Sequence, residues 1–432
     1  MPGPGLLTDR YELTMLSSWL ADGTSQRAAV FECFARRLPP GRRYGVLAGL
    51  GRLLPLITEY GFDVDEIAWL REVGAITDQC AGYLATFRFT GDVEGYREGE
   101  LYFPSSPVLT VTGTLAECVV LETLVLSVLN HDSAIASAAA RMVNAADGRP
   151  LIEMGSRRTH ERAAVADARS AYIAGFGSTS NLASGQLYGI PTAGTAAHAF
   201  TLSYAQEKDA FAAQVRALGP GTTLLVDTYD IEQGIRTAVE VAGTALGAIR
   251  IDSGDLAIES RRARTLLDSL GATRTRITVT SDLDEYVIAA LADAPIDGFG
   301  VGTRLVTGSG HPTASMVYKL VAVGDDADSL HSVAKKAAGK VSIGGHKVAY
   351  RPIADGVATG ERIMLRPHGL ESPAPTGGRL LTTRLIRQGA IVHSPTLAQV
   401  RAFHASAIAE LPFQEQSVSH GRAAFQATLE EA

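Results

Sequence analysis

Short apolar runs alternate with Ala-rich amphipathic segments from about residue 121 to residue 320. Five apolar runs stand out, over residues 151–155, 223–228, 248–255, 277–282 and 298–303, and each ends in polar or glycine residues. This alternation is typical of the strands and helices that build a parallel sheet or barrel. The carboxyl ends of barrel strands form the active-site face, so the polar ends of these runs predict where the site lies.

The two flanks of this region have different patterns. Residues 1–120 hold broken, mixed patterns with turn sequences, whereas residues 340–350 and 380–393 alternate like antiparallel strands. We therefore expect residues 1–120 and 331–432 to pack together as one discontinuous domain. Residues 121–330 are then expected to form the catalytic α/β domain.

Length and charge narrow the function classes. The 432 residues suffice for two or three domains, or for one large barrel with a second domain attached. A net charge of -7 and a pI near 5.8 disfavour nucleic acid as a partner, because such binding needs basic surface. Four of the six lysines lie between Lys335 and Lys347, either as a solvated face or as part of a site for a phosphate-rich ligand.

Cysteine usage and hydropathy bear on the compartment. Cys33, Cys80 and Cys118 lie far apart without CxxC spacing, which favours a reducing environment over disulfides or a zinc site. Asp9 and Glu12 stand where a signal peptide would need an apolar run, and no charge-free stretch reaches the roughly 18 residues of a membrane helix. We expect a cytoplasmic protein without a membrane partner.

The sharpest local signal is the stretch from Arg250 to Asp255, Arg-Ile-Asp-Ser-Gly-Asp, which ends one of the apolar runs. It places Asp252 and Asp255 around a glycine that allows a tight turn. Such carboxylates can accept hydrogen bonds from vicinal sugar hydroxyls or hold Mg²⁺, directly or through water. The alternative is an Asx turn that caps the next helix.

The ends of two further apolar runs predict a phosphate-binding site. Thr280-Ser281-Asp282 and Gly300-Val301-Gly302-Thr303 offer backbone N–H groups and hydroxyls where the following helices should start. Ordinary loop chemistry, in which Gly, Ser and Thr serve the turn and the helix cap, is the alternative.

Two motifs carry clustered charge. Arg157 and Arg158 follow another run, where guanidinium groups can clamp a carboxylate or diphosphate and stack on an aromatic ring. A surface pair bridging to acidic residues of the next helix is equally compatible. Residues 8–12, Thr-Asp-Arg-Tyr-Glu, begin a helix with a capping pattern.

His198 lies among small residues where a loop should become a helix. Thr195 fits an N-cap, which would put His198 at the third helical position, where the helix dipole favours a neutral imidazole and anionic charge. A neutral imidazole there is a competent nucleophile toward a phosphoryl group. A buried histidine bonded to the backbone is the alternative, and His160 suits an ordinary helix position.

In this order the motifs resemble those of nicotinate phosphoribosyltransferases, over most of the chain and most weakly near its C-terminal end. They occupy residues 7–15, 155–158, 178–181, 194–198, 250–255, 300–303, 335–336 and 339–340. The resemblance implies an irregular TIM-like α/β barrel with a discontinuous α/β sandwich domain built from the N- and C-terminal parts. It also implies a homodimer with active sites at its interface.

The implied reaction joins nicotinate to 5-phosphoribosyl 1-diphosphate, giving nicotinate mononucleotide and diphosphate for NAD salvage. ATP hydrolysis is implied to be coupled through a phosphohistidine at His198, with Mg²⁺ as cofactor at Asp252 and Asp255. The other implied roles are these: Arg250 for the diphosphate or ring face, Ser281, Asp282, Gly302 and Thr303 for the 5-phosphate, Arg157 for the nicotinate carboxylate, Thr179 for the pyridine pocket, and Asp9 and Tyr11 from the partner subunit for the ring.

One position departs from the pattern, because Met154 stands where many relatives carry an aromatic residue. A thioether can still pack against a pyridine edge. The alternatives are a nicotinamide or quinolinate phosphoribosyltransferase and a non-catalytic phosphosugar-binding protein. The double arginine and Thr179 favour nicotinate over nicotinamide. A lysine Schiff-base lyase is disfavoured, because residues 121–330 contain only Lys208 and Lys319 and neither ends an apolar run.

Overall fold

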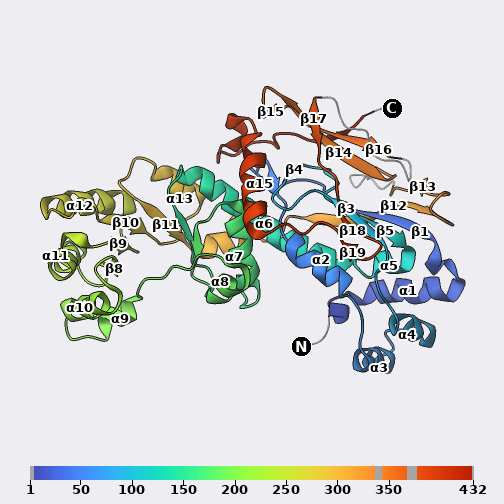
Figure 1. The fold of residues 1–432 in the computed structure, drawn as a ribbon, viewed down its shortest axis with the longest axis horizontal. Coiled ribbons are helices and arrows are strands. Elements are labelled where there is room, and N and C mark those ends of the chain that lie inside the picture. The colour runs from blue at the N-terminus through green and yellow to red at the C-terminus, as the bar shows by residue number, and fades with distance from the viewer. Residues whose placement is uncertain (1–3, 336–342, 367–376, 431–432) are drawn as a thin grey trace. The chain divides into compact units, whose positions relative to one another are not determined.

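The structure is a computed structural model that describes residues 4–335, 343–366 and 377–430 (Figure 1). The chain divides into two compact units. The first comprises residues 1–137 and 311–432, and the second comprises residues 138–310. Both ends of the chain therefore contribute to the first unit, whereas the second is continuous in sequence.

The first unit is built around an antiparallel sheet. Its strand order is β13-β12-β1-β5-β3-β18-β19. These strands are β1 (Ala28–Ala35), β3 (Asp92–Gly95), β5 (Leu109–Thr114), β12 (Met316–Gly324), β13 (His331–Ser332), β18 (Thr383–Arg387) and β19 (Ala390–Ile391). β1 is buried along almost its whole length because it lies between β5 and β12, with antiparallel partners on both sides.

A second sheet of this unit joins strands from the C-terminal part of the chain. β14 (Lys347–Ala354) pairs with β15 (Val357–Ala358), β16 (Glu361–Leu365) and β17 (Gly378–Leu380), and β16 also pairs with β20 (Ala427–Leu429). A two-stranded ribbon pairs β2 (Gly45–Val46) with β4 (Leu101–Tyr102). The alternation expected over 340–350 and 380–393 corresponds to β14, β18 and β19, although residues 340–342 lie outside the described residues.

Several helices of the first unit start at a residue whose side chain caps the helix. The helices of this unit are α1 (Arg10–Asp22), α2 (Leu50–Thr58), α3 (Val64–Glu72), α4 (Asp78–Leu84), α5 (Leu115–Val119), α15 (Leu397–Ala409) and most of α6 (Glu122–Ala146). α3, α5 and α15 each have a complete capping box. At α1 the N-cap Asp9 makes no side-chain cap bond, and Glu12 binds Thr8 and Thr123 instead, so the helix start is as expected but its cap is not.

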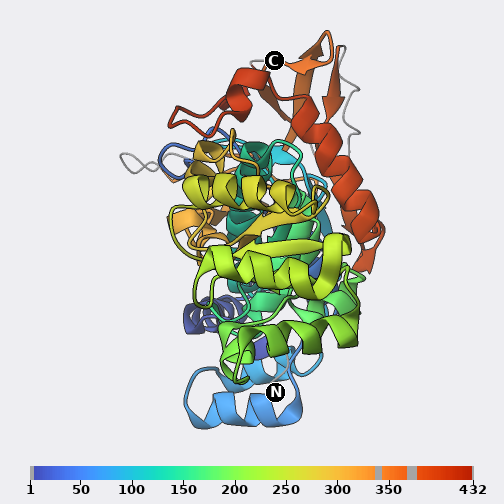
Figure 2. The same ribbon diagram turned by 90° about the vertical axis from the view of Figure 1, so that its left-hand side faces the viewer.

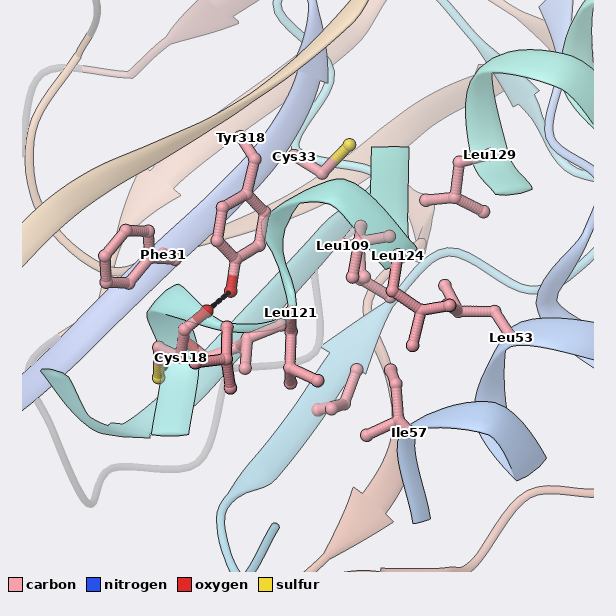
Figure 3. Close-up of a cluster of buried hydrophobic side chains, with 14 of the residues drawn as sticks. Phe31, Cys33, Leu53, Ile57, Leu109, Cys118, Leu121, Leu124, Leu129 and Tyr318 are labelled. Carbon is pink, nitrogen blue, oxygen red and sulfur yellow. Dashed lines mark hydrogen bonds between the residues drawn. The ribbon is translucent and has the colours of Figure 1, made fainter. Parts of the chain in front are cut away.

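The apolar core of the first unit lies between the large sheet and the helices α2, α5 and α6. Figure 3 shows Phe31 and Tyr318 lying against each other, and their rings stack with centroids 5.0 Å apart. The Tyr318 hydroxyl donates to the Cys118 carbonyl oxygen at 3.0 Å, so its polar end is satisfied inside the core. All three cysteines are buried and unpaired.

One helical stretch, Leu115–Ala146, is long and apolar enough to cross a membrane by length and composition alone, among the described residues. However, 67% of its most apolar window is buried inside the protein. That burial is the behaviour of a core helix.

The second unit contains a six-stranded parallel sheet in the order β7-β6-β11-β10-β9-β8. The strands are β6 (Leu151–Glu153), β7 (Ser178–Thr179), β8 (Thr223–Leu225), β9 (Ala248–Ile251), β10 (Arg276–Val279) and β11 (Gly298–Val301). Five of them match the five apolar runs. The sixth, β7, has only two residues, in a stretch rich in serine that is not among the apolar runs.

Helices connect these strands and cover the sheet. They are α7 (Ala163–Ala174), α8 (Leu182–Tyr188), α9 (His198–Leu202), α10 (Glu207–Leu218), α11 (Ile231–Ala242), α12 (Leu256–Ser269), α13 (Glu285–Ala290) and α14 (Thr303–Val306). Figure 2 shows α10, α11 and α12 lying one above another on the side that faces the viewer. Crossover helices are what parallel strands require.

The parallel sheet is curled but open. Thr192 bridges to Thr179 at the β7 edge, and six residues later His198 contacts Asp227, which follows β8 at the opposite edge. The segment from Thr192 to His198 thus runs from the β7 edge of the sheet to the β8 edge, although β7 and β8 do not pair with each other within residues 138–310. The fold is a mixed α/β fold with a half-barrel sheet, and barrel closure is absent from this unit.

The unit boundaries fall at 137/138 and 310/311, not at the expected 120/121 and 330/331. The C-terminal difference has a physical cause, because β12 pairs antiparallel with β1 and so belongs to the first unit. The N-terminal difference lies within α6, one continuous helix whose first part packs in the first unit.

Candidate active site

The carboxyl ends of the parallel strands gather the polar residues that the apolar runs predicted. Asp227 follows β8, Asp252 follows β9, and Thr280 follows β10. Hydrogen bonds link these three neighbouring strand ends. Parallel strands direct their carboxyl ends to one edge, so residues far apart in the sequence meet there.

His198 and Asp227 form the centre of this cluster. The distance from His198 Nε2 to Asp227 Oδ1 is 3.1 Å. The Asp227 side chain is 1% exposed, whereas that of His198 is 41% exposed. Asp227 Oδ2 also accepts hydrogen bonds from the Asp252 backbone N–H and the Ser253 hydroxyl. His198 is thus an accessible imidazole held by a buried carboxylate, not a buried histidine bonded to backbone.

The helix that carries His198 begins later than expected. α9 starts at His198 itself, its N-cap is Ala197, and no side chain caps it. Thr195 is not the cap because its hydroxyl accepts a hydrogen bond from Arg250 at 2.9 Å. The expected placement at the third helical position was therefore wrong. A helix of five residues also contributes little dipole, and the group that contacts the imidazole is the Asp227 carboxylate.

Arg250 connects three segments of the site. Its Nε donates to the Thr280 hydroxyl and its Nη1 donates to the Thr195 hydroxyl, both at 2.9 Å. Its Nη2 lies 3.2 Å from Asp252 Oδ1. The Arg250 side chain is 11% exposed, so the guanidinium group is positioned by the protein before any substrate binds.

The two carboxylates of the 250–255 stretch have different surroundings. Asp252 accepts hydrogen bonds from Thr280 and pairs with Arg250. Asp255 is the N-cap of α12 and accepts from the N–H groups of Ala257 and Ile258 at 3.1 Å. The capping alternative for Asp255 is thus realised in the structure, and its other carboxylate oxygen has no hydrogen-bond partner within residues 138–310.

Asp252 and Asp255 supply only part of the coordination shell that Mg²⁺ needs. Among the described residues, no group of three or more His, Cys, Asp or Glu side chains is arranged to hold a metal ion. Mg²⁺ commonly binds one or two carboxylates and completes its shell with water and substrate phosphates. Asp252 and Asp255 suit a site of that kind, and they do not form a cage by themselves.

The predicted phosphate loops have unusual backbones. Ser281 and Asp282 both have positive φ, 114° and 34°, which is costly for residues with a Cβ and is concentrated at functional sites. They lie before the helix that follows, since the N-cap of α13 is Asp284, so the expectation that they start this helix was wrong. Gly302 is the N-cap of α14, which starts at Thr303.

Arg157 follows β6 and Thr179 is the last residue of β7, at the opposite edge of the sheet from β8. Arg157 is exposed after β6 and has no ion pair in the part of the chain that the structure describes. Thr179 is fully buried in β7, where its hydroxyl donates to Glu153 and accepts from the Asn181 N–H. Burial raises the pKa of Glu153.

Met154 lies close to β11. A Cβ built on Gly300 would fall 2.7 Å from Met154 Sδ and 2.5 Å from Thr280 Cγ2. Gly300 therefore makes room for the methionine, which packs where an aromatic residue was anticipated.

Asp9 and Tyr11 belong to the first unit. Tyr11 is 46% exposed, and its hydroxyl forms a hydrogen bond with Glu122. Burial and the charge of Glu122 raise the pKa of Tyr11. Glu122 in turn lies 3.7 Å from Lys319.

The lysine cluster divides into different environments. Lys347 is buried in the first unit, and its Nζ lies 2.9 Å from Glu32. Lys335 is exposed. Lys336, Gly339 and Lys340 lie outside the described residues. Lys347 is thus a core ion-pair partner, unlike the solvated face or phosphate site considered from the sequence.

Sequence reasoning named neither Asp227 nor Glu207 as site residues. Asp227 ended one of the five apolar runs, so its place at a strand end was a signal. Glu207, at the start of α10, carries no motif. Burial and the charges of Asp227 and Asp230 raise the pKa of Glu207 to about 7.

Several known proteins are similar to this chain in sequence. A family model described as the N-terminal domain of nicotinate phosphoribosyltransferase matches residues 6–130. A nicotinate phosphoribosyltransferase of Mycobacterium tuberculosis is 56% identical, over 97% of this chain and 94% of the relative. A nicotinate phosphoribosyltransferase of Bacillus subtilis is 37% identical, over 81% of this chain and 73% of the relative.

Solved structures agree with the fold. The human nicotinic acid phosphoribosyltransferase superposes with a TM-score of 0.83 and 25% identity, covering 98% of this chain and 97% of that one. A nicotinate-nucleotide pyrophosphorylase of Pyrococcus furiosus gives a TM-score of 0.76 at 24% identity, covering 94% of this chain and 95% of that one, and shares the fold.

Proposed function

The chain belongs to the nicotinate phosphoribosyltransferase family, and from that premise we propose that His198 couples its reaction to ATP. The enzyme is a transferase of NAD biosynthesis that joins nicotinate to 5-phosphoribosyl 1-diphosphate. In the proposed coupling, ATP phosphorylates His198, and hydrolysis of the phosphohistidine accompanies the formation of nicotinate mononucleotide and diphosphate. The observation that carries this proposal is the contact between accessible His198 and buried Asp227.

The Asp227 contact assigns the two ring nitrogens. With Nε2–H donated to Asp227, the lone pair of His198 lies on Nδ1, which has no hydrogen-bond partner in residues 138–310. Nδ1 attacks the γ-phosphorus of ATP, the bond to the bridging oxygen breaks, and ADP leaves. Asp227 then stabilises the positive charge that the ring acquires. Attack of water on phosphorus returns the electron pair to Nδ1 and releases phosphate.

The remaining residues serve the glycosyl transfer in this proposal. The ribosyl centre acquires positive charge while diphosphate departs, so the ribose and the leaving group must both be held. Asp252 and Asp255 bind the ribose hydroxyls, Arg250 binds the diphosphate, and the loops after β10 and β11 bind the 5-phosphate through Ser281, Asp282, Gly302 and Thr303. Mg²⁺ at Asp252 and Asp255 would neutralise diphosphate charge.

Recognition of the pyridine is assigned to both subunits of a proposed homodimer. The exposed guanidinium of Arg157 pairs with the nicotinate carboxylate. Thr179 shapes the pocket through its buried bond with Glu153, since its hydroxyl is already engaged there. Tyr11 and Asp9 of the partner subunit complete the site, with the tyrosine ring stacked on the pyridine. We propose a cytoplasmic location, which agrees with three buried, unpaired cysteines.

The first test measures nicotinate mononucleotide from nicotinate, phosphoribosyl diphosphate and Mg²⁺, with and without ATP. Parallel reactions offer nicotinamide and quinolinate. We expect product from nicotinate only, at a rate that ATP raises. His198→Ala should abolish the stimulation by ATP and leave slow transfer, whereas His160→Ala, at an exposed histidine of the same unit, should behave like the wild type.

Each contrary outcome would refute a different part of the proposed function. A full ATP response in His198→Ala would refute the phosphohistidine. Product from another pyridine alone would overturn the assignments of Arg157 and Thr179. No product from any pyridine would favour a non-catalytic phosphosugar-binding protein.

A further inference from the structure

Glu285 links the segments that follow the two loops assigned to the 5-phosphate. It is the first residue of α13, three positions after Asp282. Its Oε2 accepts a hydrogen bond at 2.5 Å from the hydroxyl of Ser309. Ser309 follows α14 and therefore the loop that holds Gly302 and Thr303. One buried carboxylate thus joins two segments whose bonded residues are 24 positions apart.

The two loops leave neighbouring strands of the parallel sheet. β10 and β11 pair in parallel, with Val279 opposite Phe299. The segments that follow these strands therefore start side by side at the carboxyl edge of the sheet. A phosphate held by N–H groups of both segments needs them at one separation, because a hydrogen bond is lost beyond about 3.5 Å.

The backbone on both sides of this link has an unfavourable conformation. Ser309 has a φ of 53° and lies between two glycines that also have positive φ. Ser281 and Asp282, before α13, have positive φ as well. Residues with a Cβ persist in this region only when surrounding contacts hold them there. The hydrogen bond to Glu285 is such a contact for Ser309.

The other oxygen of Glu285 is anchored in the interior of the second unit. Arg141, in the part of α6 that belongs to this unit, donates from Nε to Glu285 Oε1 at 3.0 Å, and both side chains are buried. Arg141 also donates to the Tyr286 hydroxyl at 3.1 Å. At the other end of α13, Arg149 donates to the Leu291 carbonyl oxygen at 3.2 Å. Because α13 is fixed at both ends, its carboxylate can hold the partner segment in place.

From this geometry we infer that Glu285 is a positioning residue that fixes the separation of the two 5-phosphate loops. It acts through the backbone that follows each loop rather than through contact with substrate. This role rests on the proposed function, which assigns the 5-phosphate to these loops. The diphosphate is assigned to Arg250, whose hydrogen bonds go to Thr280 and to the segment before His198. Loss of the link should therefore weaken binding of the 5-phosphate selectively.

Three variants separate the link from general stability. Glu285→Gln removes the charge that faces Arg141 and Ser309. Ser309→Ala removes only the hydrogen bond to Glu285 and leaves the buried ion pair intact, so it carries the test if Glu285→Gln folds poorly. Glu232→Gln, which changes an exposed carboxylate of α11 in the same way, is the matched control.

Hydrogen exchange of the ligand-free proteins measures the link itself. In Glu285→Gln we expect the amides of residues 281–284 and 302–310 to exchange about tenfold faster, because a hydrogen bond to a charged group is lost. Ser309→Ala should affect residues 302–310 only, and Glu232→Gln neither segment. Faster exchange throughout residues 138–310, or no change in either segment, would overturn the inference.

Calorimetry with ribose 5-phosphate, and with inorganic diphosphate plus Mg²⁺, measures the consequence for binding. Glu285→Gln and Ser309→Ala should each bind ribose 5-phosphate about tenfold more weakly and diphosphate as tightly as the wild type. In the complete reaction the KM for phosphoribosyl diphosphate should rise while the KM for nicotinate stays constant. Equal losses for both ligands, or no loss for ribose 5-phosphate, would contradict a positioning role.

Thr303→Val tests the proposed function separately, because it removes a hydroxyl of the phosphate loop itself. Unchanged ribose 5-phosphate affinity in Thr303→Val would refute the assignment of the 5-phosphate to these loops, and with it the role of Glu285 in binding. Lower affinity in Thr303→Val without lower affinity in Glu285→Gln or Ser309→Ala would sustain that assignment and overturn the role of Glu285 alone.

Discussion

The carboxylate of Asp227 accepts three hydrogen bonds although only 1% of its side chain is exposed. One bond orients His198, and the other two hold the start of the loop after β9, at Asp252 and Ser253. A buried carboxylate is stable only when such donors surround it. A single residue, Asp227, therefore links the orientation of the histidine to that of the loop after β9.

Asp227→Asn is expected to disturb both functions at once. An amide cannot accept all three hydrogen bonds, because its nitrogen is a donor. We expect loss of the ATP stimulation and a stability loss of about 1–3 kcal/mol. Initial rates with and without ATP, together with denaturant unfolding, check this.

Glu232→Gln is the control for Asp227→Asn, because Glu232 is an exposed carboxylate on α11 whose one ion pair among the described residues is with Arg236. It should retain both the ATP response and the stability. An Asp227→Asn protein with normal ATP stimulation would contradict the assignment of Asp227.

Among the elements, β14 shows how a charged core holds the second sheet of the first unit. Arg351 of β14 is 1% exposed and pairs with Glu100 and Glu361. The Tyr96 hydroxyl donates to Glu361 at 2.8 Å, and Arg379 also pairs with Glu100. Despite burial, these guanidinium groups lower the pKa of Glu100. The network links β14, β16 and β17 to the loop between β3 and β4.

Removing the central cation should cost much of the stability of the first unit. Arg351→Met leaves Glu100 and Glu361 buried with reduced compensation, so we expect a loss of about 3–5 kcal/mol in the free energy of unfolding. Denaturant titration measures it. Arg362→Met, an exposed position on β16, should change stability by less than about 0.5 kcal/mol. Equal losses in both would show that the network is not decisive.

At the scale of the whole molecule, the proposed homodimer makes a distinct prediction. If Tyr11 of the partner subunit completes a site whose other residues include Arg250, each active site takes these two residues from different subunits. Tyr11→Ala and Arg250→Ala then remove residues that different subunits contribute to the same site. Heterodimers formed by mixing the two variants would contain one intact site. An equal mixture should recover about a quarter of wild-type activity after subunit exchange.

Size-exclusion chromatography gives the oligomeric state for this test, and each variant alone is its own control. Recovery absent from a mixture that demonstrably forms heterodimers would place Tyr11 in the same subunit as its site. A monomeric wild type with full activity would refute the shared site altogether.

The sequence alone predicted five of the six parallel strands and the contribution of both chain ends to one unit. It also predicted the strand ends that carry Arg250, Asp252 and Asp227, the residue that contacts His198. These features depend on local patterning: apolar runs, turn residues and motif order. β7 was missed because two residues carry no periodic signal. The start of α9 was misplaced because Thr195 has a tertiary partner, Arg250, that outweighs its local capping tendency.

Only the tertiary structure decided which groups act on one another. The pairing of His198 with Asp227 joins residues 29 positions apart, and it exists because the segment from Thr192 to His198 runs from the β7 edge of the sheet to the β8 edge. The raised pKa of Glu207 likewise depends on burial and on charges from another loop. Local sequence determines which elements form, whereas contacts and electrostatics depend on distances that the chain acquires only when it folds.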